Sequence, residues 1–168
     1  MSMYDTMPRE ETGSWPLVVG FGNVLLRDDG AGVQLMGRIH QALGADAARF
    51  IDGGTMSFSL LPYFEATDAI LVIDAADVGG FPGMVRLYED EAMDGFLQIV
   101  RRRTVHEVGL IDLMDMARLS ACLPKRRALL CIQPETIAWG SDLSPCVTKA
   151  LIPATEVALE LMQRWRDA

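Results

Sequence analysis

The sequence is poor in cysteine. Its 168 residues include only Cys122, Cys131 and Cys146, and no two of them form a C-x-x-C pair. This excludes a small domain held together by disulfides and a cysteine-rich metal or redox site. We therefore expect three free thiols, small buried side chains in a reducing compartment.

Positive charge is also scarce. Lys and Arg number 15 against 23 Asp and Glu, which gives a formal net charge of −8. Proteins that bind nucleic acid or anionic lipid usually carry a basic field, so neither a nucleic acid nor a membrane is expected as a partner. No apolar run approaches the ~20 residues of a membrane span, and residues 1–15 lack the apolar core of a signal peptide. The composition predicts a soluble, cytoplasmic protein.

Apolar residues make up 50% of the chain, and their spacing indicates how it is organised. Residues 1–15 show no periodicity and are predicted to form a flexible N-terminal extension, whereas residues 16–168 are predicted to form one domain. Short apolar runs predict strands at 17–20, 49–51, 69–73, 84–88 and 128–132. Helical spacing follows at 32–43, 60–67, 90–100, 110–122 and from 145 onward. This alternation predicts an α/β fold, a three-layer helix/sheet/helix sandwich with a twisted, mostly parallel sheet of about five strands.

In such folds ligands bind at the carboxyl ends of the strands, so the residues that follow each strand are the site candidates. Asp28 and Asp29 follow the first strand. We expect one of them to cap the next helix and the other to face the site. Asp74 ends the most apolar strand, where it either accepts backbone hydrogen bonds from the next loop or acts in the site; both readings stay open. His106 lies in a predicted loop, where a lone histidine is either solvated or functional.

Several common catalytic and nucleotide motifs are absent. The turn Gly20-Phe21-Gly22 begins like a dinucleotide fingerprint, but Leu25 stands where the third glycine belongs, and there is no GK[ST] P-loop. Neither H-E-x-x-H nor G-x-S-x-G occurs. Two carboxylates and one imidazole can hold a divalent ion while leaving coordination positions open. So small a ligand set suits a metal that arrives with another molecule.

At these positions the chain resembles the nickel–iron hydrogenase maturation endopeptidases. The resemblance rests on five motifs in series, spread over nearly the whole domain: GFGNVLLRDDGAG at 20–32, DGGT at 52–55, IDA at 73–75, TVHEVGL at 104–110 and IQPE at 132–135.

The resemblance implies an endopeptidase that removes the C-terminal extension of a hydrogenase large-subunit precursor after nickel insertion. It implies that Asp29, Asp74 and His106 contact a nickel that the substrate carries on its own thiolates, and that other divalent ions could substitute in the isolated protein. Such an ion could polarise the scissile carbonyl or activate a water. Gly54 is expected to line the substrate cleft, and Glu135 either hydrogen-bonds the peptide backbone or is solvated. The protein is expected to be a monomer.

Two other functions stay open from the residues alone. One is a small nucleotide-binding or regulatory α/β module, which rests on the Gly20-Phe21-Gly22 turn. The other is a hydrogenase assembly chaperone that docks on the large subunit without cutting it.

Overall fold

Five apolar segments form one sheet in the computed structural model, which describes residues 15–54, 58–103 and 109–168. The strands lie in the order β2-β1-β3-β5-β4, and every neighbouring pair is parallel except β4 with β5. Their bounds are β1 Leu17–Phe21, β2 Arg49–Gly54, β3 Ala69–Ala75, β4 Val85–Glu89 and β5 Arg126–Ile132. The predicted mostly parallel five-stranded sheet is therefore confirmed, and the segment predicted at 84–88 is an antiparallel edge strand.

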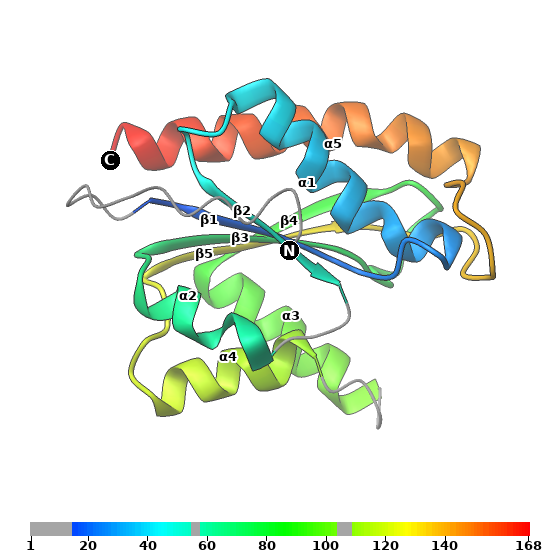
Figure 1. Ribbon diagram of the computed structural model, residues 1–168. Helices are drawn as coiled ribbons and strands as arrows, with labels where there is room; N and C mark the ends of the chain where they lie inside the picture. Colours follow the sequence, from blue (N-terminus) through cyan, green and yellow to red (C-terminus); the bar gives the residue numbers. More distant parts are fainter. Residues whose placement is uncertain (1–14, 55–57, 104–108) are drawn as a thin grey trace.

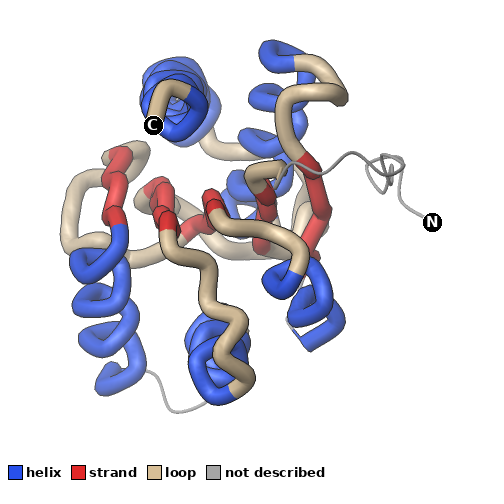
Figure 2. The backbone as a smooth tube through the Cα atoms, turned by 90° about the vertical axis from the view of Figure 1, so that its left-hand side faces the viewer, coloured by secondary structure: helices blue, strands red, loops and turns tan. Residues whose placement is uncertain are grey.

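Helices cover both faces of the sheet (Figures 1 and 2). The helix α1 (Ala31–Leu43) and the long C-terminal helix α5 (Pro145–Arg166) lie on one face. The other face carries α2 (Leu61–Glu65), α3 (Asp90–Arg103) and α4 (Leu110–Leu119). Two short 3-10 segments, η1 (Arg27–Gly30) and η2 (Phe58–Leu60), precede α1 and α2. This is the predicted three-layer sandwich.

The central strand β3 shows why the sheet needs cover on both sides. Leu71 and Ile73 pack into the core under α1 and α5, whereas Ile70 and Val72 pack into the core over α2, α3 and α4. All four side chains are fully buried. Side chains alternate between the faces of a strand, so an unbroken apolar run supplies both cores at once.

The first described residue, Trp15, is the last residue of the predicted N-terminal extension. Residues 1–14, most of the predicted extension, lie outside the described residues. Trp15 is described, and its carbonyl accepts a hydrogen bond of 2.7 Å from the Thr67 hydroxyl. In the part of the chain that is described, no helix is both long and apolar enough to cross a bilayer.

Candidate functional site

Glycines without room for a side chain bring the start of α1 against the ends of β1 and β3. A Cβ on Gly32 would lie 2.4 Å from the carbonyl oxygen of Phe21 and 2.5 Å from that of Ile73. A Cβ on Gly22, which has a φ of +116°, would lie 1.8 Å from the carbonyl oxygen of Asp29. Only glycine permits such approaches. Since Ile73 directly precedes Asp74, these contacts place the Asp29 segment beside the carboxyl end of β3.

The same contacts explain the glycines that look like a nucleotide fingerprint. The space beside Gly22 is filled by the backbone of η1, and a Cβ on Gly20 would meet the carbonyl oxygen of Gly32 at 2.7 Å. In a dinucleotide site such glycines let a pyrophosphate approach the backbone. Here they let the backbone of η1 and the start of α1 pack directly against β1 and the residue that follows it.

Asp29 is held by the loop that precedes it. Its Oδ2 accepts a hydrogen bond of 2.7 Å from the backbone N–H of Asn23, and the residue is half-buried. This bond orients the carboxylate and leaves Oδ1 as a candidate ligand atom. The residue at the N-cap of α1 is Gly30, and no side chain caps that helix.

Asp28 does not cap α1 but binds the loop between β5 and α5. It is 0% exposed, and its carboxylate accepts four hydrogen bonds from the segment between β5 and α5. The prediction that one of the two aspartates caps the next helix is therefore wrong, because both carboxylates are engaged by loop N–H and hydroxyl groups instead. Burial alone would raise the pKa of Asp28, but the hydrogen bonds from Ser144, Thr136 and Glu135 outweigh it and hold that pKa below its ordinary value.

Asp74 lies near the carboxyl end of β3, opposite Cys131 in the register with β5, and is half-buried. Strand alternation puts it on the same face as Val72, over α2, α3 and α4. Burial and, to a lesser extent, the charge of Asp74 raise the pKa of the Cys131 thiol far above its ordinary value. Cys131 therefore stays protonated and is no thiolate nucleophile.

His106, the third predicted ligand, lies outside the described residues, in the segment 104–108 between α3 and α4. The helices α3 and α4 themselves pack on the face of the sheet that carries Asp74. Among the residues that the structure does describe, no three His, Cys, Asp or Glu side chains form a metal-binding group. The structure describes Asp29 and Asp74 but not His106, so the convergence of the three residues stays a prediction.

Two further predicted residues lie at the same edge of the sheet. Gly54 ends β2 with a φ of +49°, and its carbonyl accepts a hydrogen bond of 2.9 Å from the Gly22 N–H. The side chain of Glu135 is exposed, and its backbone N–H donates to Asp28. Contact of either residue with substrate stays a prediction.

Gln133 belongs to the IQPE motif at 132–135, but no role of its own was predicted for it from the sequence. Its Oε1 accepts hydrogen bonds from the N–H groups of Val78 and Gly80, at 2.9 and 3.4 Å. It thereby fastens the loop that follows Asp74. Its place in that motif, directly after a buried strand, did not reveal this role, because the loop that Gln133 binds is more than fifty residues away in the sequence.

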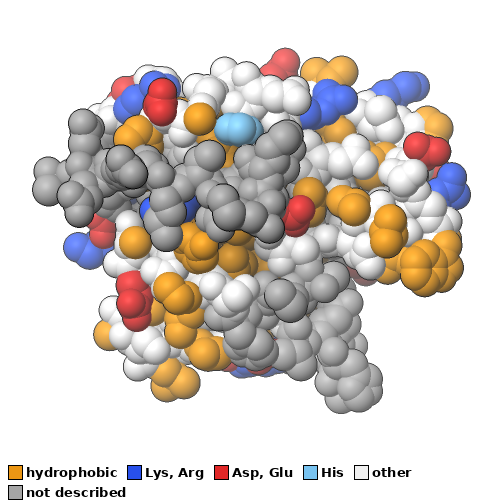
Figure 3. Space-filling model, in the orientation of Figure 1, with side chains coloured by type: hydrophobic (Ala, Val, Ile, Leu, Met, Phe, Trp, Pro, Cys, Tyr) orange, Lys and Arg blue, Asp and Glu red, His pale blue; other side chains and the backbone are white. Residues whose placement is uncertain are grey.

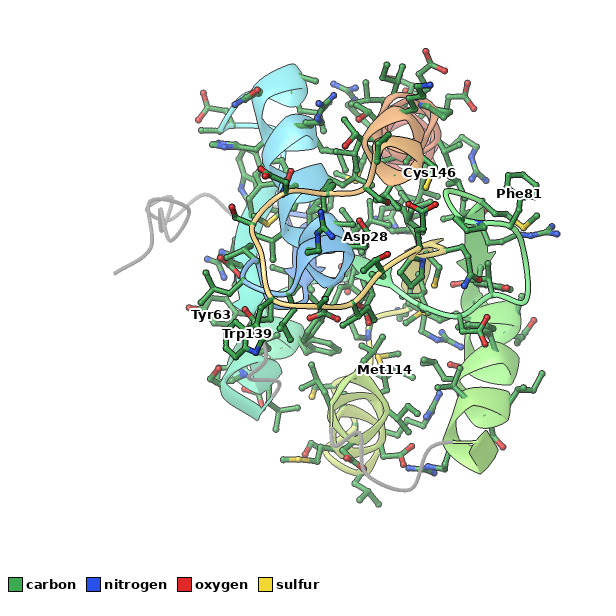
Figure 4. The ribbon with its side chains drawn as sticks, turned by 90° about the vertical axis from the view of Figure 1, so that its right-hand side faces the viewer. Asp28, Tyr63, Phe81, Met114, Trp139 and Cys146 are labelled. Carbon is green, nitrogen blue, oxygen red and sulfur yellow. The ribbon has the colours of Figure 1, made fainter. Side chains whose placement is uncertain are left out.

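Figure 4 looks onto this edge of the sheet, with Asp28 between the start of α1 and the loop that leads to α5. Trp139 and Phe81 lie at opposite sides of the view. Carboxylate oxygens from η1 and from the end of β3 would suit a divalent ion that another molecule brings.

Comparisons with known proteins agree with the fold. The family model described as hydrogenase maturation protease matches residues 33–161. The chain is 30% identical over 161 residues to the hydrogenase expression/formation protein HupD of Bradyrhizobium diazoefficiens, covering 95% of this chain and 83% of that protein. It is 28% identical over 149 residues to the hydrogenase 2 maturation protease of Escherichia coli, with 88% and 90% covered.

The fold is also that of a solved relative. The hydrogenase maturating endopeptidase HybD from E. coli superposes with a TM-score of 0.80 at 28% identity, over 89% of this chain and 93% of that one. The family match spans well over half of the chain. The described motifs at 20–32, 73–75 and 132–135 lie at or beside the sheet edge where α/β proteins bind ligands. The chain belongs to the hydrogenase maturation protease family and is a hydrolase, an endopeptidase.

Proposed function

We propose that this endopeptidase removes the C-terminal extension of a nickel–iron hydrogenase large-subunit precursor after nickel insertion, and that it recognises the nickel which the precursor carries. The proposed ligands are Asp29, Asp74 and His106. The observation that carries the proposal is the packing of Gly32 against Phe21 and Ile73, because it puts the Asp29 segment beside the end of the strand that carries Asp74.

The donor set suits an ion supplied by the substrate. Two carboxylates are hard ligands and an imidazole is a borderline one, and the set contains no soft thiolate. The protein alone would therefore bind nickel weakly. A nickel already held by the precursor would supply Lewis-acid chemistry at the scissile carbonyl. The Asn23 N–H would keep the Asp29 carboxylate oriented, and Asp74 would be presented from the rigid end of β3.

This arrangement would also make nickel insertion a checkpoint. A precursor without nickel offers the three side chains no ion to bind, so it would be spared. We propose that the enzyme acts as a monomer in the cytoplasm, where the precursor would be folded and loaded.

The test compares a purified precursor with and without nickel, and follows its mass after incubation with the protein. We expect the wild-type protein to release the C-terminal peptide from the nickel-loaded precursor only. Asp74→Asn and His106→Ala should abolish release while their circular dichroism stays that of the wild type. Asp77→Asn is the matched control, since Asp77 is exposed in the loop three residues after Asp74. This variant should cleave the precursor at the wild-type rate.

The alternatives make different predictions in the same assay. A non-cleaving chaperone would bind the precursor without any loss of mass. A nucleotide-binding module would be stabilised against heat by NAD, FMN or ATP and would not cleave. Full cleavage by Asp74→Asn or His106→Ala would refute the proposed ligands.

A further inference from the structure

Asp28 is a buried carboxylate that the proposed chemistry does not use. Its Oδ2 accepts hydrogen bonds from the N–H groups of Glu135 and Thr136, both at 2.9 Å. Ser144 adds two more, from its N–H to Oδ1 at 2.7 Å and from its hydroxyl to Oδ2 at 2.8 Å. A buried carboxylate is tolerated only when such bonds replace water, and charge-assisted bonds of this kind are strong.

These bonds fasten both ends of the segment 133–144, which leads from β5 to α5, here called the crossing loop. Its middle is fastened as well. The Arg27 N–H donates to the Gly140 carbonyl at 2.7 Å, and the Gly140 N–H donates to the Leu25 carbonyl at 3.0 Å. The crossing loop is therefore tied at three points to the loop that carries Asp29.

The two tied loops expose large apolar side chains. Leu25 is 56% exposed and Trp139 is 82% exposed, and Val24 and Ile137 are also exposed. Figure 3 shows hydrophobic side chains at the right-hand end of the molecule, where Figure 1 places these loops. Single exposed apolar residues are ordinary, but four on two locked loops beside a candidate site indicate a contact surface.

We propose that Asp28 is a positioning residue, which locks the crossing loop to the Asp29 loop so that Leu25, Ile137 and Trp139 form a preformed docking surface for the hydrogenase precursor. This rests on the proposed function. The precursor is the expected occupant because the surface is continuous with the loop that presents Asp29, so a substrate whose tail reaches Asp29 must also cover it. A rigid aromatic anchor on a fixed loop is typical of the residues that dominate protein interfaces.

The first experiment measures KM and kcat for cleavage of the purified, nickel-loaded precursor by the full chain. Trp139→Ala should raise KM about tenfold and leave kcat within about twofold, because it removes binding energy that is equal in ground and transition states. Leu119→Ala is the matched control. Leu119 is 88% exposed at the C-terminal end of α4, from which the chain leads to the start of β5, whereas Trp139 lies beyond the end of β5. The KM of the Leu119→Ala variant should not change.

The second experiment tests the role of Asp28 itself. Asp28→Asn has nearly the same shape but turns one accepting oxygen into a donor, so it cannot accept all four hydrogen bonds. Amide hydrogen exchange should show faster exchange at Glu135, Thr136 and Ser144, with the amides of β3 still protected. The KM of this variant should rise as that of Trp139→Ala does. If Asp28 served only the stability of the whole fold, the variant would instead show faster amide exchange in β3 as well. The KM of its folded molecules would then equal that of the wild type.

The outcomes separate the two proposals. If the wild-type protein does not cleave the precursor, the proposed function fails. If it cleaves and Trp139→Ala keeps the wild-type KM, the docking surface is wrong. Should Asp28→Asn not fold, Ser144→Ala removes only the hydroxyl donor, and unchanged exchange and KM in that variant would overturn the role of Asp28.

Discussion

The hydroxyl and the N–H of Ser144 both donate to the carboxylate of Asp28, although the two residues are 116 positions apart in the sequence. Ser144 occupies the N-cap position of α5, yet its side chain caps no helix N–H. A serine before a proline and an aspartate before a helix both look like local caps. In the folded protein they bind each other, and the two loops that border the candidate site are joined.

Position 29 should require a carboxylate, whereas the length of the side chain that carries it should matter less. Asp29→Glu is expected to keep measurable cleavage of the nickel-loaded precursor, whereas Asp29→Asn should lose at least about 100-fold in kcat/KM, because an amide is a far weaker ligand for a divalent ion. The comparison is made by mass spectrometry of the released peptide. Asp46→Asn, in an exposed loop, serves as the control. Equal rates for the Asn and Glu variants would remove Asp29 from the ligand set.

Two glycine-to-alanine changes should shift the free energy of unfolding in opposite directions. Gly22→Ala places a Cβ 1.8 Å from the Asp29 carbonyl at a φ of +116°, so we expect it to lower the free energy of unfolding by more than about 3 kcal/mol. Gly95 lies exposed in α3, where a Cβ meets nothing within 4 Å. Gly95→Ala should raise the free energy of unfolding by about 0.5–1 kcal/mol. Urea unfolding measures both, and a tolerated Gly22→Ala would contradict the close packing of η1.

Asp94 should contribute stability that disappears in acid. It lies 2.6 Å from Arg118 and 2.6 Å from Arg127, which join α3 to α4 and β5. Burial alone would raise the pKa of Asp94, but the hydrogen bonds and charges of the two arginines outweigh it and hold that pKa below the ordinary 3.8. The carboxylate therefore stabilises the fold above about pH 4, and this contribution is lost as the pH falls through the folded-state pKa.

The corresponding experiment is urea unfolding of Asp94→Asn against the wild type. The variant should be less stable near neutral pH, and the difference should shrink in acid as the wild-type carboxylate is protonated. Asp46→Asn should show no such pH-dependent difference, since Asp46 is exposed. A constant difference at every pH would mean that lost packing, and not charge, explains the Asp94 variant.

Cys131 should be chemically inert in the native protein. It is fully buried in β5, and burial together with the charge of Asp74 raises its pKa, so the thiol stays protonated in mildly alkaline buffer. Iodoacetamide followed by peptide mass spectrometry should label the half-buried Cys146 first and Cys131 only after unfolding. We expect Cys131→Ala to keep cleaving the precursor. Loss of activity with an intact fold would point to a thiol in the chemistry.

The order of strands and helices was predictable because local spacing records which faces are buried. The all-apolar run at Ala69–Ile73 indicated a strand covered on both faces, and β3 is covered on both faces. The alternating run at 84–88 indicated a half-buried or an edge strand, and β4 lies at the edge of the sheet. Boundaries were less certain: the helix predicted at 110–122 ends at Leu119, since Ala121 has a φ of +55° that no helix continues.

The candidate site was only partly predictable. Asp28, Asp29 and Asp74 were site candidates because of their places at strand ends, since carboxyl ends of parallel strands meet at one edge. The family resemblance then selected Asp29 over Asp28. His106 stays a prediction, since it lies outside the described residues. The role of Gln133 was missed, although the residue is part of the IQPE motif, because its side chain binds a loop that only the folded chain brings within reach.

By itself the sequence determined the layers of the fold and the edge of the sheet where chemistry is expected, because hydrophobic periodicity and strand ends are local properties. Only the tertiary structure gave the two neighbouring aspartates different environments. It buried Asp28 under the crossing loop and left Asp29 half-exposed at the edge. The physical reason is that a carboxylate is buried where enough N–H and O–H donors converge on it, and those donors come from residues more than one hundred positions away.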